Sequence, residues 1–220
     1  MGEPLISEKV HDFPAEGITV QFRPGRCIHS ANCVRGLPAV FRPGERPWIH
    51  TERAPADAIA QAVHTCPTGA LTCIRKDGGA AEPVPARNTA VLSPDGPIYL
   101  RGRIQVVTMG GEVALEGNRM ALCRCGASKR KPLCDGSHRK VGFRDPGELP
   151  YVETPVAEAG RTLEVVMSPK GPLMFRGPVT VVSGSGVARS EGGSRAFCRC
   201  GGSRNKPYCD GTHARIGFTG

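Results

Sequence analysis

The sequence predicts a mostly β fold with a small α+β part at the N-terminus, and three observations support this prediction. The 220 residues include 29 glycines and 20 prolines, more than a fifth of the chain, which favours short strands and many turns over long helices. From about residue 90 onward the sequence repeats itself once. Apolar residues at helical spacing occur in the front part, between Pro55 and His64.

The repeat has an offset of 75 residues and sets the domain organisation. Ser93-Pro94 recurs as Ser168-Pro169, and Gly142-Phe143 recurs as Gly217-Phe218, without a gap. Chance does not keep one offset over so many positions, so the second part of the chain is a tandem repeat. The predicted domains are 1–80, 88–150 and 155–220, joined by linkers at 78–90 and 145–160.

The front domain reads as a small α+β unit. Ile18–Phe22 alternates between apolar and polar residues like a half-buried strand. Pro55–His64 is rich in alanine and predicts a helix, since proline suits a first helical turn. Two further short strands are predicted at Trp48-Ile49 and Ala70–Ile74.

Each repeat reads as short strands followed by a loop rich in cysteine. The predicted strands are Ile98–Leu100, Ile104–Thr108 and Met120–Leu122, with counterparts at Leu173–Phe175, Val179–Val182 and Ala196–Phe197. The residues after the third cysteine predict a turn into a short helix, with Asp135 or Asp210 as its N-cap.

Each repeat places three thiols and one imidazole within 16 residues. The eight candidate ligands are Cys123, Cys125, Cys134 and His138, and Cys198, Cys200, Cys209 and His213. A Cys-x-Cys pair brings two sulfurs close enough for one iron, and Cys134 and His138 can serve a second iron. Zinc and iron–sulfur clusters both accept mixed cysteine and histidine ligands, and the spacing alone does not exclude zinc.

The two motifs resemble the CDGSH iron–sulfur domain of the mitoNEET type over roughly residues 90–220. The first reads Cys134-Asp135-Gly136-Ser137-His138 at its end, and the second has Thr212 in place of the serine. The resemblance implies one [2Fe-2S] cluster per motif, with the histidine as the exposed fourth ligand. It also implies a β-rich fold in which two units pair as an intertwined dimer. Because one chain supplies both units, we expect a monomer with an intramolecular pseudo-twofold β-cap pair.

The front domain resembles the divergent ferredoxin-like domain with a single [4Fe-4S] or [3Fe-4S] cluster, over about residues 15–78. The run from Cys27 to Cys33 matches a ferredoxin run, except that Ser30 stands at the middle ligand position. Cys66-Pro67 matches the ferredoxin Cys-Pro turn. The ligands of this third cluster would be Cys27, Cys33 and Cys66.

Several alternatives stay open for this front domain. Three cysteines suit a [3Fe-4S] cluster, whereas a [4Fe-4S] cluster would need Ser30, His29 or water as its fourth ligand. Cys73 lies on a predicted strand and reads as a buried thiol, with a ligand or redox role as the alternative. A domain of this fold that has lost its cluster is also compatible with the sequence.

The net charge of +9 is concentrated in the repeats. Residues 1–80 carry 9 basic and 8 acidic groups, residues 81–150 carry 11 and 7, and residues 151–220 carry 9 and 5. The basic residues of the two loops are Arg124, Lys129, Arg130 and Lys131, and Arg199, Arg204 and Lys206. They would compensate anionic metal–thiolate centres, and solvated surface charge is the alternative interpretation.

These features favour a soluble cytoplasmic protein that transfers electrons or clusters, or senses redox state. We expect a redox partner or an apo-protein acceptor and no membrane association, since no apolar run is long enough to span a bilayer. Neither a hydrolytic triad signature nor a phosphate-binding or dinucleotide-binding motif is present, so we do not expect an enzyme. The alternative is a zinc-stabilised basic binding module. The 5% aromatic content disfavours nucleic acid as its target.

Overall fold

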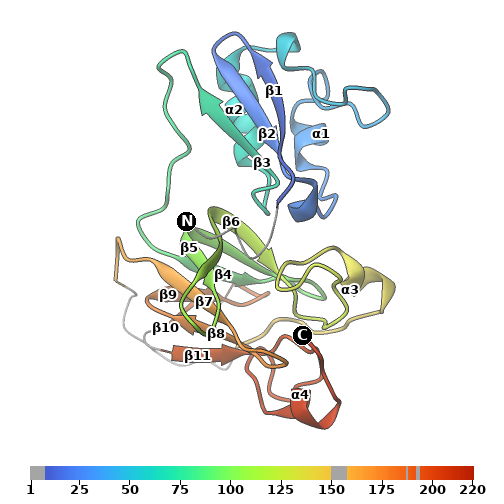
Figure 1. The fold of residues 1–220 in the computed structure, drawn as a ribbon, viewed down its shortest axis with the longest axis vertical. Coiled ribbons are helices and arrows are strands. Elements are labelled where there is room, and N and C mark those ends of the chain that lie inside the picture. Colours follow the sequence, from blue (N-terminus) through green and yellow to red (C-terminus); the bar gives the residue numbers. More distant parts are fainter. Residues whose placement is uncertain (1–7, 150–157, 187, 192–193) are drawn as a thin grey trace. The chain divides into compact units, whose positions relative to one another are not determined.

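The computed structural model describes residues 8–149, 158–186, 188–191 and 194–220 (Figure 1). The protein is mostly β, with a few short helices. It has two compact units, one spanning Glu8–Pro83 and one spanning Val84–Gly220. No helix in the described part of the chain is both long and apolar enough to cross a bilayer.

The front unit is a three-stranded antiparallel sheet with the order β1-β2-β3. Its strands are β1 (His11–Ala15), β2 (Ile18–Phe22) and β3 (Leu71–Arg75). Its helices are α1 (Asn32–Gly36) and α2 (Ala56–His64), with single 3₁₀ turns at η1 (Pro24–Arg26) and η2 (Thr51–Arg53). The predicted strand at 18–22 and the predicted helix are therefore confirmed, and the strand predicted at 70–74 is β3, shifted by one residue.

A small apolar core holds this sheet and helix together. Ile18 and Val20 of β2 are fully buried, as are Ile59 and Val63 of α2, because residues four apart on a helix share a face. The strand predicted at Trp48-Ile49 is wrong, since Ile49 makes only an isolated bridge with Phe41.

In the described residues, the second unit contains eight strands and two helices of a single turn each. The strands are β4 (Thr89–Leu92), β5 (Ile98–Val107), β6 (Val113–Leu122), β7 (Leu163–Met167), β8 (Leu173–Arg176), β9 (Val179–Val182), β10 (Ala188–Glu191) and β11 (Ser194–Phe197). The helices are α3 (Ser137–Lys140) and α4 (Thr212–Arg215). The order in the sheet is β10-β9-β4-β5-β7-β8-β11, and β6 pairs with β5.

The two repeats exchange strands in this sheet. Strand β4 of the first repeat lies parallel to β9 of the second, with Ala90 opposite Val181. Strand β7 of the second repeat lies parallel to β5 of the first, with Val165 opposite Val106. Because 90 and 165 differ by 75, as do 106 and 181, the two pairings are the same contact made in both directions.

The exchanged strands β4 and β7 are among the elements that were not predicted from the sequence. Thr89 and Ala90 of β4 fall at the end of the predicted linker 78–90, which is therefore wrong at its C-terminal end. Strand β7 begins three residues after the predicted linker 145–160. Each strand is short and pairs with the next strand along the chain, β4 with β5 and β7 with β8, as well as with a strand of the other repeat. The short apolar segments alone did not distinguish them from linker residues.

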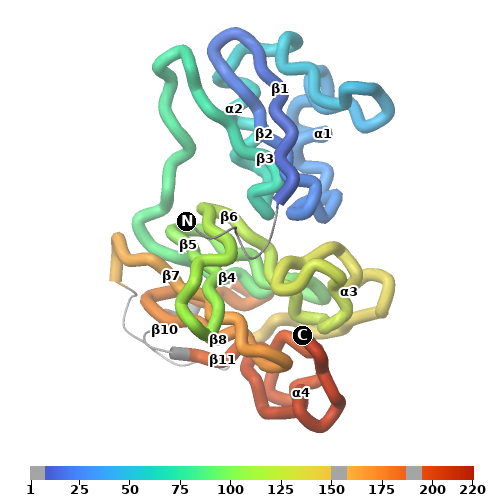
Figure 2. Tube along the Cα trace, viewed as in Figure 1, coloured from blue at the N-terminus to red at the C-terminus, as the bar shows by residue number. Residues whose placement is uncertain are grey.

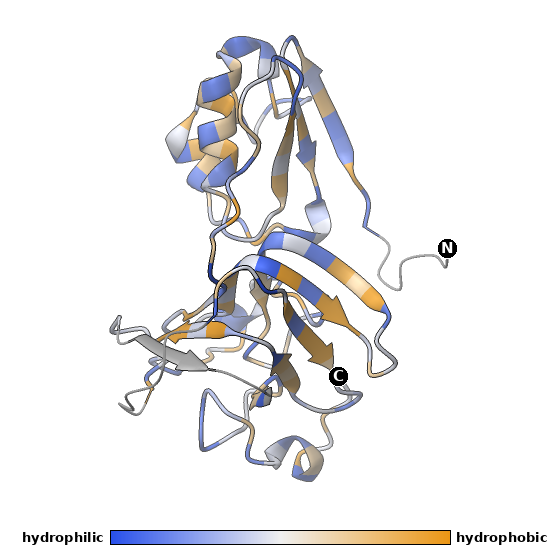
Figure 3. Ribbon diagram, turned by 90° about the vertical axis from the view of Figure 1, so that its left-hand side faces the viewer, coloured by the Kyte–Doolittle hydropathy of each residue, from blue (hydrophilic) through white to orange (hydrophobic). Residues whose placement is uncertain are grey.

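One core serves both repeats. Its fully buried members include Leu100 and Val106 of β5, Leu163 of β7 and Val181 of β9. Buried residues alternate with more exposed ones along most of β5. Figure 3 colours the ribbon by hydropathy, and apolar and polar residues follow one another along its strands. Neither repeat therefore has a complete core of its own. The loops that carry α3 and α4 lie together beyond one end of the sheet (Figure 2).

Candidate metal centres

Short ladders of hydrogen bonds place the first and third cysteines of each motif side by side. The amide of Cys123 donates to the carbonyl oxygen of Pro132 (2.9 Å), and the amide of Cys134 donates to that of Ala121 (2.8 Å). The same two bonds recur in the second motif, from Cys198 to Pro207 (2.8 Å) and from Cys209 to Ala196 (2.9 Å). In each motif, these backbone hydrogen bonds hold the first and third cysteines at neighbouring positions.

The predicted ligands of each motif form two pairs. In the first motif, the sulfurs of Cys123 and Cys125 are 3.7 Å apart, and Sγ of Cys134 is 3.4 Å from Nδ1 of His138. The corresponding distances in the second motif are 3.8 Å, between Cys198 and Cys200, and 3.2 Å, between Cys209 and His213. In the described residues, no three His, Cys, Asp or Glu side chains are grouped tightly enough for a single ion.

An aspartate organises the turn before each histidine, although not as the predicted N-cap. Gly136 takes the N-cap position of α3. The Asp135 carboxylate accepts hydrogen bonds from the amides of Ser137 (2.9 Å) and Lys129 (2.9 Å). These bonds outweigh the opposing effect of partial burial and lower the pKa of Asp135 to about 2. Asp210 makes the same two bonds in the second motif, and its pKa is also lowered.

The arginine between the first two cysteines is buried in both motifs. Arg124 is 2% exposed and donates to the carbonyl oxygens of Gly96 (2.9 Å) and Ser93 (2.6 Å). Arg199 donates in the same way to the carbonyl oxygens of Gly171 and Ser168. The interpretation as solvated surface charge is therefore wrong for these two arginines, which tie each Cys-x-Cys segment to a turn of the sheet.

The two arginines differ in their charge partners. Arg124 forms an ion pair with the carboxylate of Asp145, whose side chain is 11% exposed. The position 75 residues later holds Gly220, and Arg199 has no ion pair with a carboxylate in the described part of the chain. Asp145 was not among the residues predicted from the sequence, although the 75-residue offset marks it as a difference between the two copies.

The pKa shifts show which of the thiols need a bound positive charge in order to become thiolates. The hydrogen bond with Cys125 lowers the pKa of Cys123 to about 6, and the same bond raises the pKa of Cys125. Burial raises the pKa of Cys134 to about 11 and also raises that of Cys198. Buried thiolates need a nearby positive charge, and a bound metal supplies it.

The two motifs also differ in exposure. Cys134 and His138 are 3% and 6% exposed, whereas Cys209 and His213 are only partly buried. Burial lowers the pKa of His138. The expectation of an exposed histidine is therefore wrong for the first motif.

The front unit holds the third set of predicted ligands around a cavity of about 300 Å³. Cys27, Cys33 and Cys66 all line this cavity, together with His29 and Ser30. Burial raises the pKa of the Cys33 thiol. Cysteine thiolates at such a cavity fit an iron–sulfur cluster, and the oxygen or nitrogen donors beside them could supply a fourth ligand.

Cys73 lies apart from the residues that line this cavity. Its Sγ is 3.9 Å from Nε2 of His64, on the side where β3 packs against α2. The structure therefore groups Cys27, Cys33 and Cys66 as predicted and leaves Cys73 outside the group.

Comparisons with known proteins match this arrangement of sites. A model of the CDGSH-type iron-binding zinc finger matches residues 95–139 and 170–214, and a model of the divergent 4Fe-4S mono-cluster domain matches residues 14–76. The chain is similar to the uncharacterized protein YjdI of Escherichia coli K12, at 34% identity over 71 residues that cover 32% of this chain and 93% of that protein. YjdI of E. coli O157:H7 matches to the same extent. No solved structure matches the chain significantly.

Proposed function

Because the chain belongs to the family of tandem CDGSH iron-binding proteins with an N-terminal divergent 4Fe-4S mono-cluster domain, we propose that it is an electron-transfer protein with two [2Fe-2S] clusters. Each cluster would be held by three cysteines and one histidine of one motif. The observation that carries this proposal is the division of each motif into one thiol–thiol pair and one thiol–imidazole pair. A two-iron cluster needs two ligands for each iron, and this division supplies them.

The ligand type supports a redox role. A neutral imidazole in place of a fourth thiolate leaves the site less negative, which makes reduction easier. The guanidinium groups of Arg124 and Arg199 lie beside the Cys-x-Cys segments and favour the added negative charge. The protein would bind the cluster, exclude water from the buried ligands and set the potential, and the cluster would supply the one-electron chemistry.

We further propose that the two units form an intramolecular pseudo-twofold pair, so that a monomer holds both sites. The reciprocal contacts of β4 with β9 and of β7 with β5 support this arrangement. Such a pair needs no second chain, because each repeat completes its core with a strand from the other.

For the front unit we propose one further cluster, held by Cys27, Cys33 and Cys66. The cavity that these three cysteines line supports the proposal. A [3Fe-4S] cluster would use the three thiolates alone, and a [4Fe-4S] cluster would recruit His29, Ser30 or water as well.

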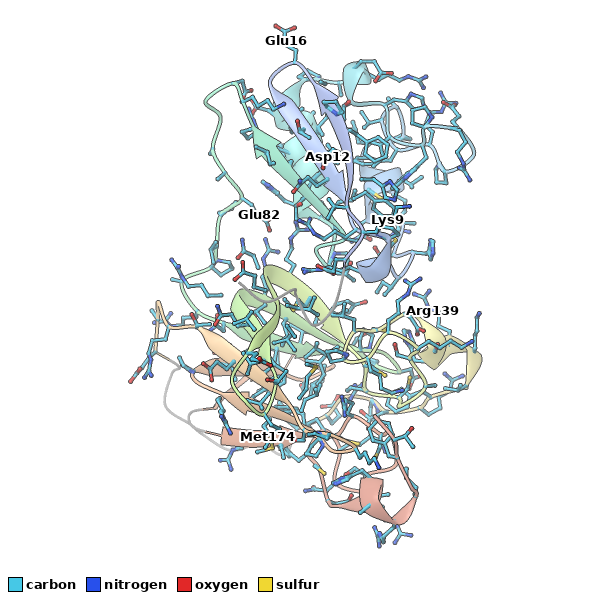
Figure 4. All side chains as sticks on the ribbon, in the orientation of Figure 1. Lys9, Asp12, Glu16, Glu82, Arg139 and Met174 are labelled. Carbon is cyan, nitrogen blue, oxygen red and sulfur yellow. The ribbon has the colours of Figure 1, made fainter. Side chains whose placement is uncertain are left out.

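A redox partner would approach the ends of the two repeats. Beside each histidine, the short helix carries exposed cations, which are Arg139 and Lys140 on α3 and Arg215 on α4; Figure 4 labels Arg139. Val141 and Ile216, each 55% exposed, follow these helices at equivalent positions. An apolar side chain bordered by cations suits an acidic protein partner.

Cluster transfer to an apo-protein is a second candidate, favoured by the partial exposure of Cys209 and His213. We place the protein in the cytoplasm, since most of its cysteines fall in metal-binding motifs, and a reducing compartment would keep them available as thiolate ligands. We propose neither an enzymatic activity nor a nucleic-acid target.

An anaerobic reductive titration of the purified protein tests the electron-transfer role. The proposal predicts that about two electrons per chain enter the repeats reversibly, one for each cluster, with a third electron if the front cluster is present. Clusters that fall apart on reduction would favour cluster transfer over electron transfer. A protein that takes up no electrons would exclude the redox role.

A further inference from the structure

The two metal-binding loops touch each other through one glycine from each. Gly126 follows Cys125 and Gly201 follows Cys200, and both have a φ of +78°. A Cβ atom on Gly126 would lie 2.3 Å from the carbonyl oxygen of Cys200 and 2.8 Å from its carbonyl carbon. A Cβ atom on Gly201 would lie 2.6 Å from the carbonyl oxygen of Cys125. Each glycine therefore packs on the backbone of a candidate ligand in the other loop.

These distances leave no space for a side chain at either position. Nonbonded carbon atoms at optimal separation are about 3.5–4.0 Å apart, so a methyl group at 2.3 Å from an oxygen overlaps it severely. The obstacle is a backbone carbonyl rather than the end of a flexible side chain. It can give way only if the cysteine that carries it moves.

Further contacts connect the second repeat to the first metal-binding loop. The ring of Phe218, at the end of the second repeat, lies 5.5 Å from Nζ of Lys131 in the first loop. It also lies 5.3 Å from the guanidinium carbon of Arg199. Arg199 in turn interacts electrostatically with Cys123 of the first loop. The loops therefore form one packed assembly.

We propose that Gly126 and Gly201 are reciprocal positioning residues, each holding the second cysteine of the other motif in place, so that the two cluster sites are gained and lost together. The inference rests on the proposed function, since it requires that both sites hold clusters. Gly126 would thus position a ligand of the second site, and Gly201 would position a ligand of the first.

The test is the variant Gly126→Ala in a protein whose two clusters can be told apart. The substitution His138→Cys gives the first site four cysteines and changes its visible spectrum, while the second site keeps His213. With iron and a chelator present, absorption then follows each cluster separately. The proposal predicts that Gly126→Ala speeds loss of the second cluster about tenfold, a size typical of residues that orient metal ligands.

Gly142→Ala is the matched control. Gly142 lies in the same repeat and has a φ of +61°, so alanine there suffers the same kind of left-handed strain. A Cβ atom at Gly142 meets nothing within 4 Å. The second cluster should therefore be lost within about twofold of the parent rate. If Gly126→Ala affects only the first cluster, or acts no more strongly than Gly142→Ala, the proposal is wrong.

If Gly126→Ala does not fold, a second variant tests whether the two cluster sites are linked. The variant Cys134→Ala removes a ligand atom from the first site without adding bulk at the contact, and linked sites predict about tenfold faster loss of the second cluster. An unchanged loss rate would show that the sites are independent. If the unmodified protein binds no clusters at all, the proposed function fails instead, so the two failures are distinguishable.

Discussion

At the scale of single residues, the ion pair of Arg124 and Asp145 is the clearest difference between the two candidate metal sites. Arg124 is 2% exposed, and its guanidinium also donates to two backbone carbonyls. A buried arginine whose carboxylate is removed keeps an uncompensated charge away from water. The first site therefore depends on Asp145 for its stability, whereas Gly220 occupies the equivalent position in the second copy.

We expect Asp145→Asn to lower the free energy of unfolding by about 3 kcal/mol, because the amide cannot neutralise Arg124. Urea unfolding of the variant and the parent measures this change. The control is Arg144→Gln, which removes only the exposed ion pair with Asp95 and should cost less than about 1 kcal/mol. Equal effects of both substitutions would show that the burial of the pair does not matter.

The histidines should make cluster retention depend on pH. A protonated imidazole cannot bind iron, and unperturbed histidine titrates near about pH 6.5. Burial lowers the pKa of His138, so in the folded chain this side chain resists protonation. Its contribution to stability is complete above about pH 6.5 and is lost as the pH falls toward the lower pKa of the folded state.

Two variants separate the histidines experimentally. His213→Cys leaves His138 as the one histidine among the candidate ligands of the repeats, and we expect its cluster to be lost in acid only below about pH 6.5. The double variant His138→Cys with His213→Cys should lose this acid sensitivity. Stopped-flow absorption after a pH jump measures both, and equal loss rates in the double variant and the parent would contradict the role of the histidines.

At the scale of elements, Asn88 joins the exchanged strand β4 to both repeats. Its side-chain amide donates to the carbonyl oxygens of Arg161 (2.9 Å) and Pro178 (3.0 Å). Its side-chain oxygen accepts from the amide of Arg103 (2.8 Å). Asn88 is 2% exposed, so water cannot replace these bonds without rearrangement.

Replacing Asn88 by alanine should lower the free energy of unfolding by about 3 kcal/mol, since one buried and two partly buried backbone groups lose their partner. The half-buried Asn118 on β6 is the control, and its alanine variant should cost about 1 kcal/mol or less. Urea unfolding of the two variants gives the comparison. A cost at Asn88 no greater than at Asn118 would contradict the bridging role.

The elements that the sequence predicted are those with local signals. The helix at Ala56–His64 has its own apolar face, and β2 has its own alternation. By contrast, β4 and β7 are short and pair on one side with the next strand along the chain and on the other with a strand about 90 or 60 residues away, as the pairings of Ala90 with Val181 and of Val165 with Val106 show. The exchange between repeats could not be predicted, because a short apolar segment carries no record of a distant partner.

At the scale of the whole molecule, the repeats share one core and carry two candidate metal sites. The shared core and the glycine contact between the loops both cross from one repeat to the other. The front unit adds a separate cavity lined by cysteines. We therefore predict that one chain holds three iron–sulfur clusters.

The candidate sites were more predictable than the fold around them. The spacing of Cys123, Cys125 and Cys134 is a local pattern, and the 75-residue offset confirmed that it occurs twice. The buried state of Arg124 and its pairing with Asp145 were not predictable, because they depend on how the chain returns to the sheet after α3. The sequence indicated which charged side chains lie near a site, but it did not indicate whether those side chains are buried or exposed.

The most direct test of the central claim is an anaerobic visible absorption spectrum with iron and acid-labile sulfide counted on the same sample. The account predicts [2Fe-2S] bands and about seven or eight irons per chain, for a three-iron or a four-iron cluster in the front unit respectively. About four irons would confirm the two repeats and leave the front unit without a cluster. A colourless protein that contains zinc and no sulfide would contradict the account and make a zinc-stabilised binding module the better description.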